Sequence, residues 1–112
     1  MDIIFLQECA IPELSKDKKL QEKWNCGPSI WSGCNSDRNA GLGVLFRNAD
    51  FSIQKVQHVV KGRLLCVDGL WFGREIRLIN VYCPTSLSYR DNVLSFLPQL
   101  LLCNRNVFLG GD

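Results

Sequence analysis

The chain opens and closes with the same pattern, a short apolar run that ends at a carboxylate. Asp2–Glu8 reads Asp-Ile-Ile-Phe-Leu-Gln-Glu, and the last six residues, Val107–Asp112, read Val-Phe-Leu-Gly-Gly-Asp. Four consecutive apolar residues are too few for an ordinary helix, and they predict a strand that is covered on both faces. Open α/β sheets bind ligands beyond the carboxyl ends of their strands. Two strands that end at Glu8 and Asp112 can therefore hold a divalent cation between them.

Apolar and alternating runs predict the elements between these two strands. We expect a surface helix and then five strands, of which the last two form a hairpin across Gly73-Arg74-Glu75: helix Ser15–Trp24, and strands near Ile30–Trp31 and over Gly41–Phe46, Phe51–Val60, Leu64–Phe72 and Ile76–Tyr82. Strand alternation assigns the residues of the last strand to two faces. Leu78, Asn80 and Tyr82 share one face, and Ile79 and Val81 share the other.

A second helix is predicted after the hairpin. Ser86 or Ser88 can cap it, and its apolar positions have amphipathic spacing: Tyr89, Val93, Phe96, Leu97, Leu100 and Leu101. Pro98 lacks a backbone donor, so we expect a kink or an early stop there. The order of elements indicates an α/β fold with a mixed, mostly antiparallel sheet and outer helices.

Composition limits the class of protein. With 112 residues the chain is at most one domain, and 46% hydrophobic and 21% charged residues are typical of a soluble globular protein. No apolar run approaches the roughly 20 residues of a membrane span. No basic segment precedes the first apolar run, which argues against a signal peptide. A net charge of +2 permits a nucleic-acid partner without requiring one.

The six cysteines are scattered and form no C-x-x-C pair. This pattern favours reduced, mostly buried thiols in an intracellular protein, nuclear or cytoplasmic, over disulfides. The only histidine, His58, has no partner at zinc-ligand spacing, so we expect no zinc site.

Three stretches in this order resemble motifs of the endonuclease/exonuclease/phosphatase superfamily. Asp2–Glu8 is similar to its Leu-Gln-Glu motif, Leu78–Thr85 (Leu-Ile-Asn-Val-Tyr-Cys-Pro-Thr) to its Tyr-x-Pro motif, and Val107–Asp112 to the beginning of its Gly-Asp-x-Asn motif. With Gly41–Phe46 between them, the sequences of these stretches are most similar to those of the endonuclease domain of LINE-type (non-LTR) retrotransposons. That domain is related to apurinic/apyrimidinic endonucleases.

The resemblance implies a role for each matching residue. Glu8 would bind a catalytic Mg²⁺, Tyr82 would contact the scissile phosphate, and Asp112 would orient and help deprotonate the attacking water. Thr85 stands where many relatives carry an asparagine near the phosphate, which a hydroxyl replaces only in part. Simpler readings stay open: Glu8 as a strand-end charge, Tyr82 as a core tyrosine, and Asp112 as a turn residue.

The resemblance also implies that the chain is a partial domain. Its first motif would precede Met1, and the later asparagine and Asp-His motifs would follow Asp112. We therefore expect residues 1–112 to be the N-terminal portion of the domain, half of a two-sheet α/β sandwich. We further expect the inner face of its one sheet to lie open, because the second sheet would be encoded beyond Asp112.

The function that this reading implies is Mg²⁺-dependent phosphodiester hydrolysis, a DNA endonuclease that nicks target DNA for retrotransposition. DNA and the remainder of its own domain are the expected partners, with no membrane and no small organic cofactor, and the fragment alone would be inactive. Two alternatives stay open. One is a non-catalytic, degenerate retroelement fragment, and the other is a different superfamily phosphoesterase, such as an inositol-phosphate phosphatase or a deadenylase.

Overall fold

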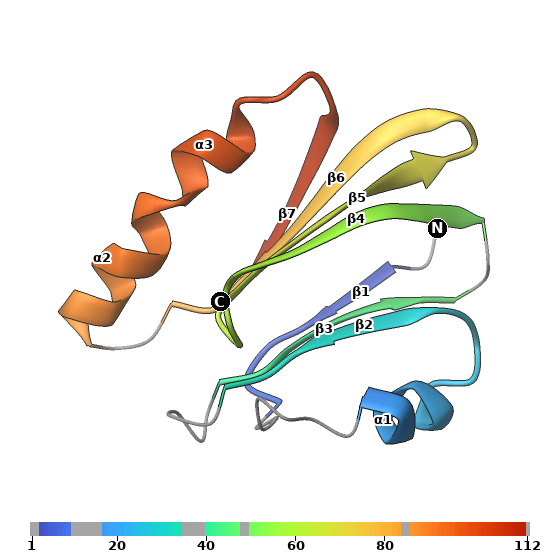
Figure 1. Ribbon diagram of the computed structural model, residues 1–112, viewed down its shortest axis with the longest axis horizontal. Coiled ribbons are helices and arrows are strands. Elements are labelled where there is room, and N and C mark those ends of the chain that lie inside the picture. Colours follow the sequence, from blue (N-terminus) through green and yellow to red (C-terminus); the bar gives the residue numbers. More distant parts are fainter. Residues whose placement is uncertain (1–2, 10–16, 35–39, 48–49, 84–85, 112) are drawn as a thin grey trace.

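The computed structural model describes residues 3–9, 17–34, 40–47, 50–83 and 86–111, with the backbone alone at 17–19 and 89. Ten elements follow one another in the described residues (Figure 1): β1 (Ile3–Leu6), α1 (Asp17–Lys23), β2 (Ser29–Ser32), β3 (Leu42–Phe46), β4 (Phe51–Val60), β5 (Leu64–Trp71), β6 (Arg74–Val81), α2 (Leu87–Ser95), α3 (Leu97–Leu101) and β7 (Asn106–Gly111). Each element predicted from the sequence is present, with ends that differ by a few residues.

The strands form two sheets that face each other (Figure 1). One sheet has the order β1-β3-β2 and is antiparallel, and the other has the order β4-β5-β6-β7. In the second sheet β7 runs parallel to β6, while the other pairs are antiparallel. The helix α1 lies beside the first sheet, and α2 and α3 cover the outer face of the second. The predicted mixed α/β sandwich with outer helices is confirmed.

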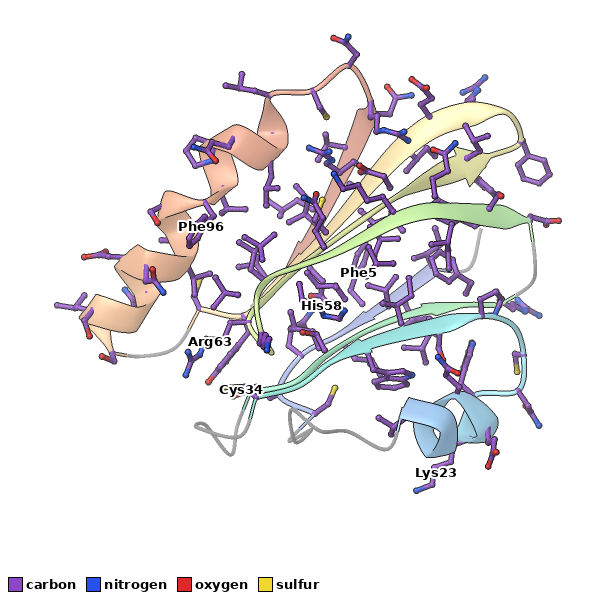
Figure 2. The ribbon with its side chains drawn as sticks, viewed as in Figure 1. Phe5, Lys23, Cys34, His58, Arg63 and Phe96 are labelled. Atoms are coloured by element: carbon purple, nitrogen blue, oxygen red, sulfur yellow. The ribbon has the colours of Figure 1, made fainter. Side chains whose placement is uncertain are left out.

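The expectation of a single sheet with an open inner face is wrong. This one chain contributes strands to both sheets, and their inner faces pack together in a central core: Ile30, Leu42, Val44, Phe46, Phe51, Leu65, Val67, Ile76, Leu78 and Tyr82. Phe5 packs against this core from β1 and points between the sheets (Figure 2). The apolar patterns predicted strands correctly, but a strand's pattern does not tell which sheet it joins.

A second apolar cluster lies on the outer face of the β4–β7 sheet, where α2 and α3 cover it. Its buried residues are Leu64, Cys66, Ile79, Val81, Val93 and Leu100. The predicted alternation along β6 is therefore confirmed, because Leu78 and Tyr82 belong to the central core while Ile79 and Val81 belong to the outer cluster. Burial on both faces explains why apolar residues occupy both faces toward the end of β6, at Leu78, Ile79 and Val81.

The predicted second helix is interrupted. The helix α2 ends at Ser95, and α3 begins at Leu97 with Pro98 in its first turn, which confirms the early stop. Because of this break only part of the apolar stripe faces the sheet: Val93 and Leu100 are buried, whereas Phe96 and Leu101 are exposed. Tyr89 lies outside the residues whose side chains are described.

Two further expectations need correction. Strand β1 is not covered on both faces, because Ile4 is 40% exposed while Ile3 and Phe5 pack inward. The cysteines are all free, as expected for reduced thiols, but only Cys66 is buried. Burial raises the pKa of the Cys66 thiol to about 11.

The β5–β6 hairpin turns more tightly than the sequence suggested. Trp71 pairs with Arg74, so the turn consists of Phe72 and Gly73 alone, and Glu75 is already in β6. Both turn residues have positive φ, 50° and 78°. That conformation matches the twist of the flanking strands, which is why two-residue turns of this kind dominate hairpins.

Candidate functional site

The carboxyl ends of β1, β6 and β7 meet at one edge of the sandwich (Figure 1). Strands β6 and β7 are parallel, and their register places Val81 beside Gly111. Gly110 touches β1 from the opposite sheet, because a Cβ added there would lie 2.7 Å from Cγ of Phe5. Only a glycine permits this close approach of the two sheets.

Asn80 links the two sheets at this edge. Its side chain is completely buried, and its amide nitrogen donates hydrogen bonds to the carbonyl oxygens of Leu6 and Gly43, each at 3.0 Å. Its amide oxygen accepts a hydrogen bond of 2.7 Å from Nε2 of Gln7. Buried polar groups are tolerated where they are hydrogen-bonded, and each of these partners belongs to β1, β3 or the residue after β1.

Glu8 follows this linkage in the irregular segment after β1. Its φ is 55°, a left-handed conformation that is uncommon for residues other than glycine, and its side chain is exposed. The next residue, Cys9, donates its backbone N–H to the carbonyl of Gly41 at 3.0 Å. The segment is thus held on both sides of Glu8, and a carboxylate is presented to solvent from a fixed backbone.

Tyr82 follows directly after β6 and is anchored differently. Its backbone N–H donates to the carbonyl of Arg63 at 2.8 Å, and its side chain is 8% exposed within the central core. Arg63 belongs to the β4–β5 turn at the same end of the sheets (Figure 2). In that turn Gly62 accepts a backbone hydrogen bond from Gly41 and donates one to Oγ of Ser32, so the turn joins both sheets.

The structure brings together two of the four predicted site residues. Glu8 and Tyr82 lie at the same edge. Asn80 is hydrogen-bonded to Leu6 and Gln7, the two residues before Glu8. Asn80 also precedes Tyr82 by two positions, so the two side chains face the same way. Thr85 and Asp112 fall outside the described residues, although Asp112 directly follows β7, which ends at this edge.

Asn80 and Gln7 belong to this edge although they were not among the predicted site residues. Strand alternation alone predicts no more than that Asn80 shares a face with Leu78 and Tyr82. A signal was available, because an asparagine at an inward position of an apolar strand must find several hydrogen-bond partners when it is buried. Which partners it finds depends on how the two sheets are stacked, and no local pattern encodes that.

An ionic cluster lies away from this edge, on the outer face of the β4–β7 sheet. Arg77 binds Asp68 through two hydrogen bonds of 2.7 and 2.9 Å and donates a third to the carbonyl of Leu100. Arg105 approaches the same carboxylate at 3.9 Å. The hydrogen bonds from Arg77 lower the pKa of the Asp68 carboxyl. This cluster ties α3 to the sheet and is structural.

The donor set near Glu8 is compatible with Mg²⁺. Among the described residues no group of three or more histidine, cysteine or acidic side chains could hold a metal ion. Mg²⁺ does not require such a group, since it commonly keeps several waters and takes one or two protein carboxylates. Glu8 supplies one exposed carboxylate on a fixed backbone, which fits this mode of binding.

Comparison with solved structures identifies the fold. No protein-family model matches the chain, and no curated protein matches it significantly. A humanized D. rerio TDP2 carrying 14 mutations matches 99% of this chain with a TM-score of 0.72 and 18% identity. A truncated C. elegans TDP2 (TM-score 0.58) and the selenomethionine form of C. elegans TDP2 (TM-score 0.57) also match 99% of the chain, each at 23% identity.

The chain has the fold of part of an endonuclease/exonuclease/phosphatase sandwich. TDP2 belongs to that superfamily, and this chain covers 51%, 48% and 37% of the three TDP2 chains. It therefore spans about half the length of the first two structures and over a third of the length of the third. Separately, none of the helices among the described residues is long and apolar enough to cross a membrane.

Proposed function

We propose that the chain is the N-terminal portion of a Mg²⁺-dependent phosphodiesterase domain that acts on DNA. The observation that carries the proposal is the meeting of three strand ends, β1, β6 and β7, at one edge of a superfamily fold. Glu8 and Tyr82 stand directly at two of these ends. Each also lies in a stretch that resembles a superfamily motif, so the motifs and the fold point to the same edge.

The finer proposal is a LINE-type endonuclease that nicks target DNA for retrotransposition, inside the cell, in the nucleus or the cytoplasm. The sequences of the three motifs support a LINE-type endonuclease over other members of the superfamily. The fold by itself does not select a substrate, since one fold supports many chemistries.

Four residues of the chain receive roles. Glu8 would hold Mg²⁺, which when bound offsets negative charge on the phosphoryl oxygens and positions the nucleophile. The Tyr82 hydroxyl would donate a hydrogen bond toward the phosphate, and Thr85 would lie near the same group. Asp112 would orient the attacking water and accept its proton.

Glu8→Gln tests the metal assignment in the protein expressed from the complete reading frame that encodes these residues. The amide keeps the shape of the side chain and removes the charge that holds the cation, so Mg²⁺-dependent nicking of supercoiled plasmid should be abolished while the far-UV circular dichroism is retained. Exposed Glu75, far along β6 from the edge, provides the matched control as Glu75→Gln. Nicking by Glu8→Gln at the wild-type rate across a Mg²⁺ titration would refute the assignment.

Tyr82→Phe tests whether the tyrosine does more than fill the core. Its ring packs in the central core, and phenylalanine preserves that packing. If the hydroxyl acts on charge that develops in the transition state, the nicking rate should fall by more than the affinity for DNA. Equal losses in rate and affinity, or no loss in either, would assign Tyr82 to packing.

A non-catalytic, degenerate retroelement fragment is the second candidate. Two observations favour it: the chain spans about half of two TDP2 structures, and the described residues include no group of three or more histidine, cysteine or acidic side chains that could hold a metal ion. The nucleotide sequence on both sides of the reading frame separates the two functions. Intact flanking motifs and a downstream reverse transcriptase favour the nuclease, and stop codons favour the fragment.

A further inference from the structure

The Gln7–Asn80 amide pair is the least expected feature of the core. Asn80 lies on the inner face of β6, where its neighbours on that face, Leu78 and Tyr82, belong to the central apolar core. A polar side chain there has a desolvation cost that an apolar residue would avoid. Asn80 offsets this cost with three hydrogen bonds, all directed at the end of β1 and at Gly43 beside it.

The chemistry of the partners fixes the orientation of both amides. The carbonyl oxygens of Leu6 and Gly43 only accept hydrogen bonds, so Asn80 must turn its NH₂ group toward them. Its oxygen is then left for Gln7, and Gln7 must present its own NH₂ group, as the 2.7 Å contact from Nε2 shows. A residue without both a donor pair and an acceptor could not satisfy this set.

The pair acts on the backbone that carries Glu8. Leu6 and Gln7 are held by Asn80, and Cys9 is held by the carbonyl of Gly41. Glu8 lies between these anchors in a left-handed conformation, which is strained for a residue other than glycine and persists only where the surroundings determine it. Asn80 also lies two residues before Tyr82, which directly follows β6 and packs in the central core.

We infer that the Gln7–Asn80 amide pair positions Glu8 for cation binding. The inference rests on the proposed function, because it requires Glu8 to be a metal ligand. Neither Gln7 nor Asn80 touches the cation in this account. They act through the backbone by fixing the segment that presents the carboxylate, as hydrogen-bonded groups behind metal ligands commonly do.

The experiment uses the ¹⁵N-labelled protein expressed from the complete reading frame that encodes these residues, with Mn²⁺ alone as a paramagnetic probe. Broadening of backbone amide signals during a Mn²⁺ titration locates the ion and gives its apparent affinity. Gln7→Met keeps the length of the side chain and removes the hydrogen bond to Asn80, while Asn80 retains its bonds to Leu6 and Gly43. Gln57→Met makes the same chemical change on β4, and it is the matched control. Glu8→Gln reports whether the carboxylate is the ligand, and thermal melting of each variant reports the fold.

The expected result is selective broadening around Glu8 that Glu8→Gln abolishes. Gln7→Met should then need about tenfold more Mn²⁺ for the same broadening, and it should stay folded with a lowered melting temperature, because the buried Asn80 oxygen loses its partner. Gln57→Met should bind Mn²⁺ like the wild type.

Other outcomes separate the two proposals. If Glu8→Gln abolishes binding but Gln7→Met leaves the affinity unchanged, the positioning role is wrong and the metal assignment stands. If the wild type shows no broadening near Glu8, both are wrong. If Gln7→Met does not fold, Gln7→Asn, one methylene too short to reach Asn80, replaces it with the same expected loss. If neither variant folds, the pair is a requirement of the fold, and the positioning role is overturned.

Discussion

Glu8 combines a backbone conformation suited to glycine with a side chain that the proposed chemistry needs. Its φ of 55° would be free of strain in glycine, whereas an L side chain with a Cβ resists it. At this position stability and the proposed function favour different residues. Glycine would relieve the backbone strain, but it has no carboxylate to bind a cation.

This difference predicts different outcomes for two substitutions. Glu8→Gly and Glu8→Ala both remove the carboxylate and should both lose Mn²⁺-induced broadening at this segment. The glycine variant should be more stable than the alanine variant by about 1 kcal/mol, since alanine retains the left-handed strain. Urea denaturation of the two variants measures this difference. An alanine variant as stable as the glycine variant would show that the segment relaxes and that the backbone is not held as described.

Among elements, the Asp68–Arg77 pair joins β5, β6 and α3. Both side chains are largely buried, with exposed fractions of 7% for Asp68 and 14% for Arg77. Arg77 also binds the carbonyl of Leu100, and in this way the pair fastens the short helix α3 to the sheet. A helix of five residues has little stability of its own, so this contact and the burial of Leu100 hold it in place.

The lowered pKa of Asp68 predicts how stability depends on pH. Because the folded state favours the ionised carboxylate, its contribution is present above the ordinary aspartate pKa of about 3.9 and is lost as the pH falls through the lowered value. Asp68→Asn should flatten the decline of the unfolding free energy as the pH falls below about 4. At pH 7 it should cost about 3 kcal/mol, since Arg77 loses its buried partner. Asp91→Asn, at an exposed site on α2, is the control. Parallel pH profiles for Asp68→Asn and the wild type would contradict this account.

The sequence predicted elements well and their partners poorly. Local sequence patterns are enough to predict strands such as Gly41–Phe46 and β6. Burial on one or both faces of a strand leaves an apolar run or an alternation that can be read from neighbouring residues. The pairing of Asp68 with Arg77 depends on the β5–β6 register, and the contacts of Asn80 depend on the stacking of the sheets. Such contacts join residues up to 74 positions apart, so they leave no local signal. The motifs predicted Glu8 and Tyr82 as site residues. The hydrogen bonds between Gln7, Asn80 and Leu6 could be seen only in the structure.

At the scale of the whole molecule, the two edges of the β4–β7 sheet differ. Strand β4 carries Lys55 and His58, and its pairing with β5 is irregular at two places, between Ile53 and Lys55 and between His58 and Val60. Charges and bulges of this kind protect an edge from pairing with another chain. Strand β7 has no such protection, because it reads Asn-Val-Phe-Leu-Gly-Gly without a charge or a proline.

Strand β7 is also apolar on the surface that it exposes. Among the described residues it pairs with β6 alone, and Phe108 and Leu109 are 43% and 55% exposed on its opposite faces. An edge of this kind presents unpaired backbone groups together with apolar side chains, which favours the addition of another strand.

The 112-residue chain should therefore self-associate through β7 although its two sheets already share a packed core. Leu109→Lys places a charge on the exposed face of that strand and should shift the chain toward the monomer in sedimentation velocity. Val56→Lys, at a similarly exposed position on β4, should leave the association unchanged, because that edge is already protected. The comparison is made at several protein concentrations, with circular dichroism to confirm that each variant is folded. The prediction is wrong if the wild-type chain stays monomeric at all concentrations. It is also wrong if Val56→Lys loses association and Leu109→Lys does not, because the chains would then not associate through β7.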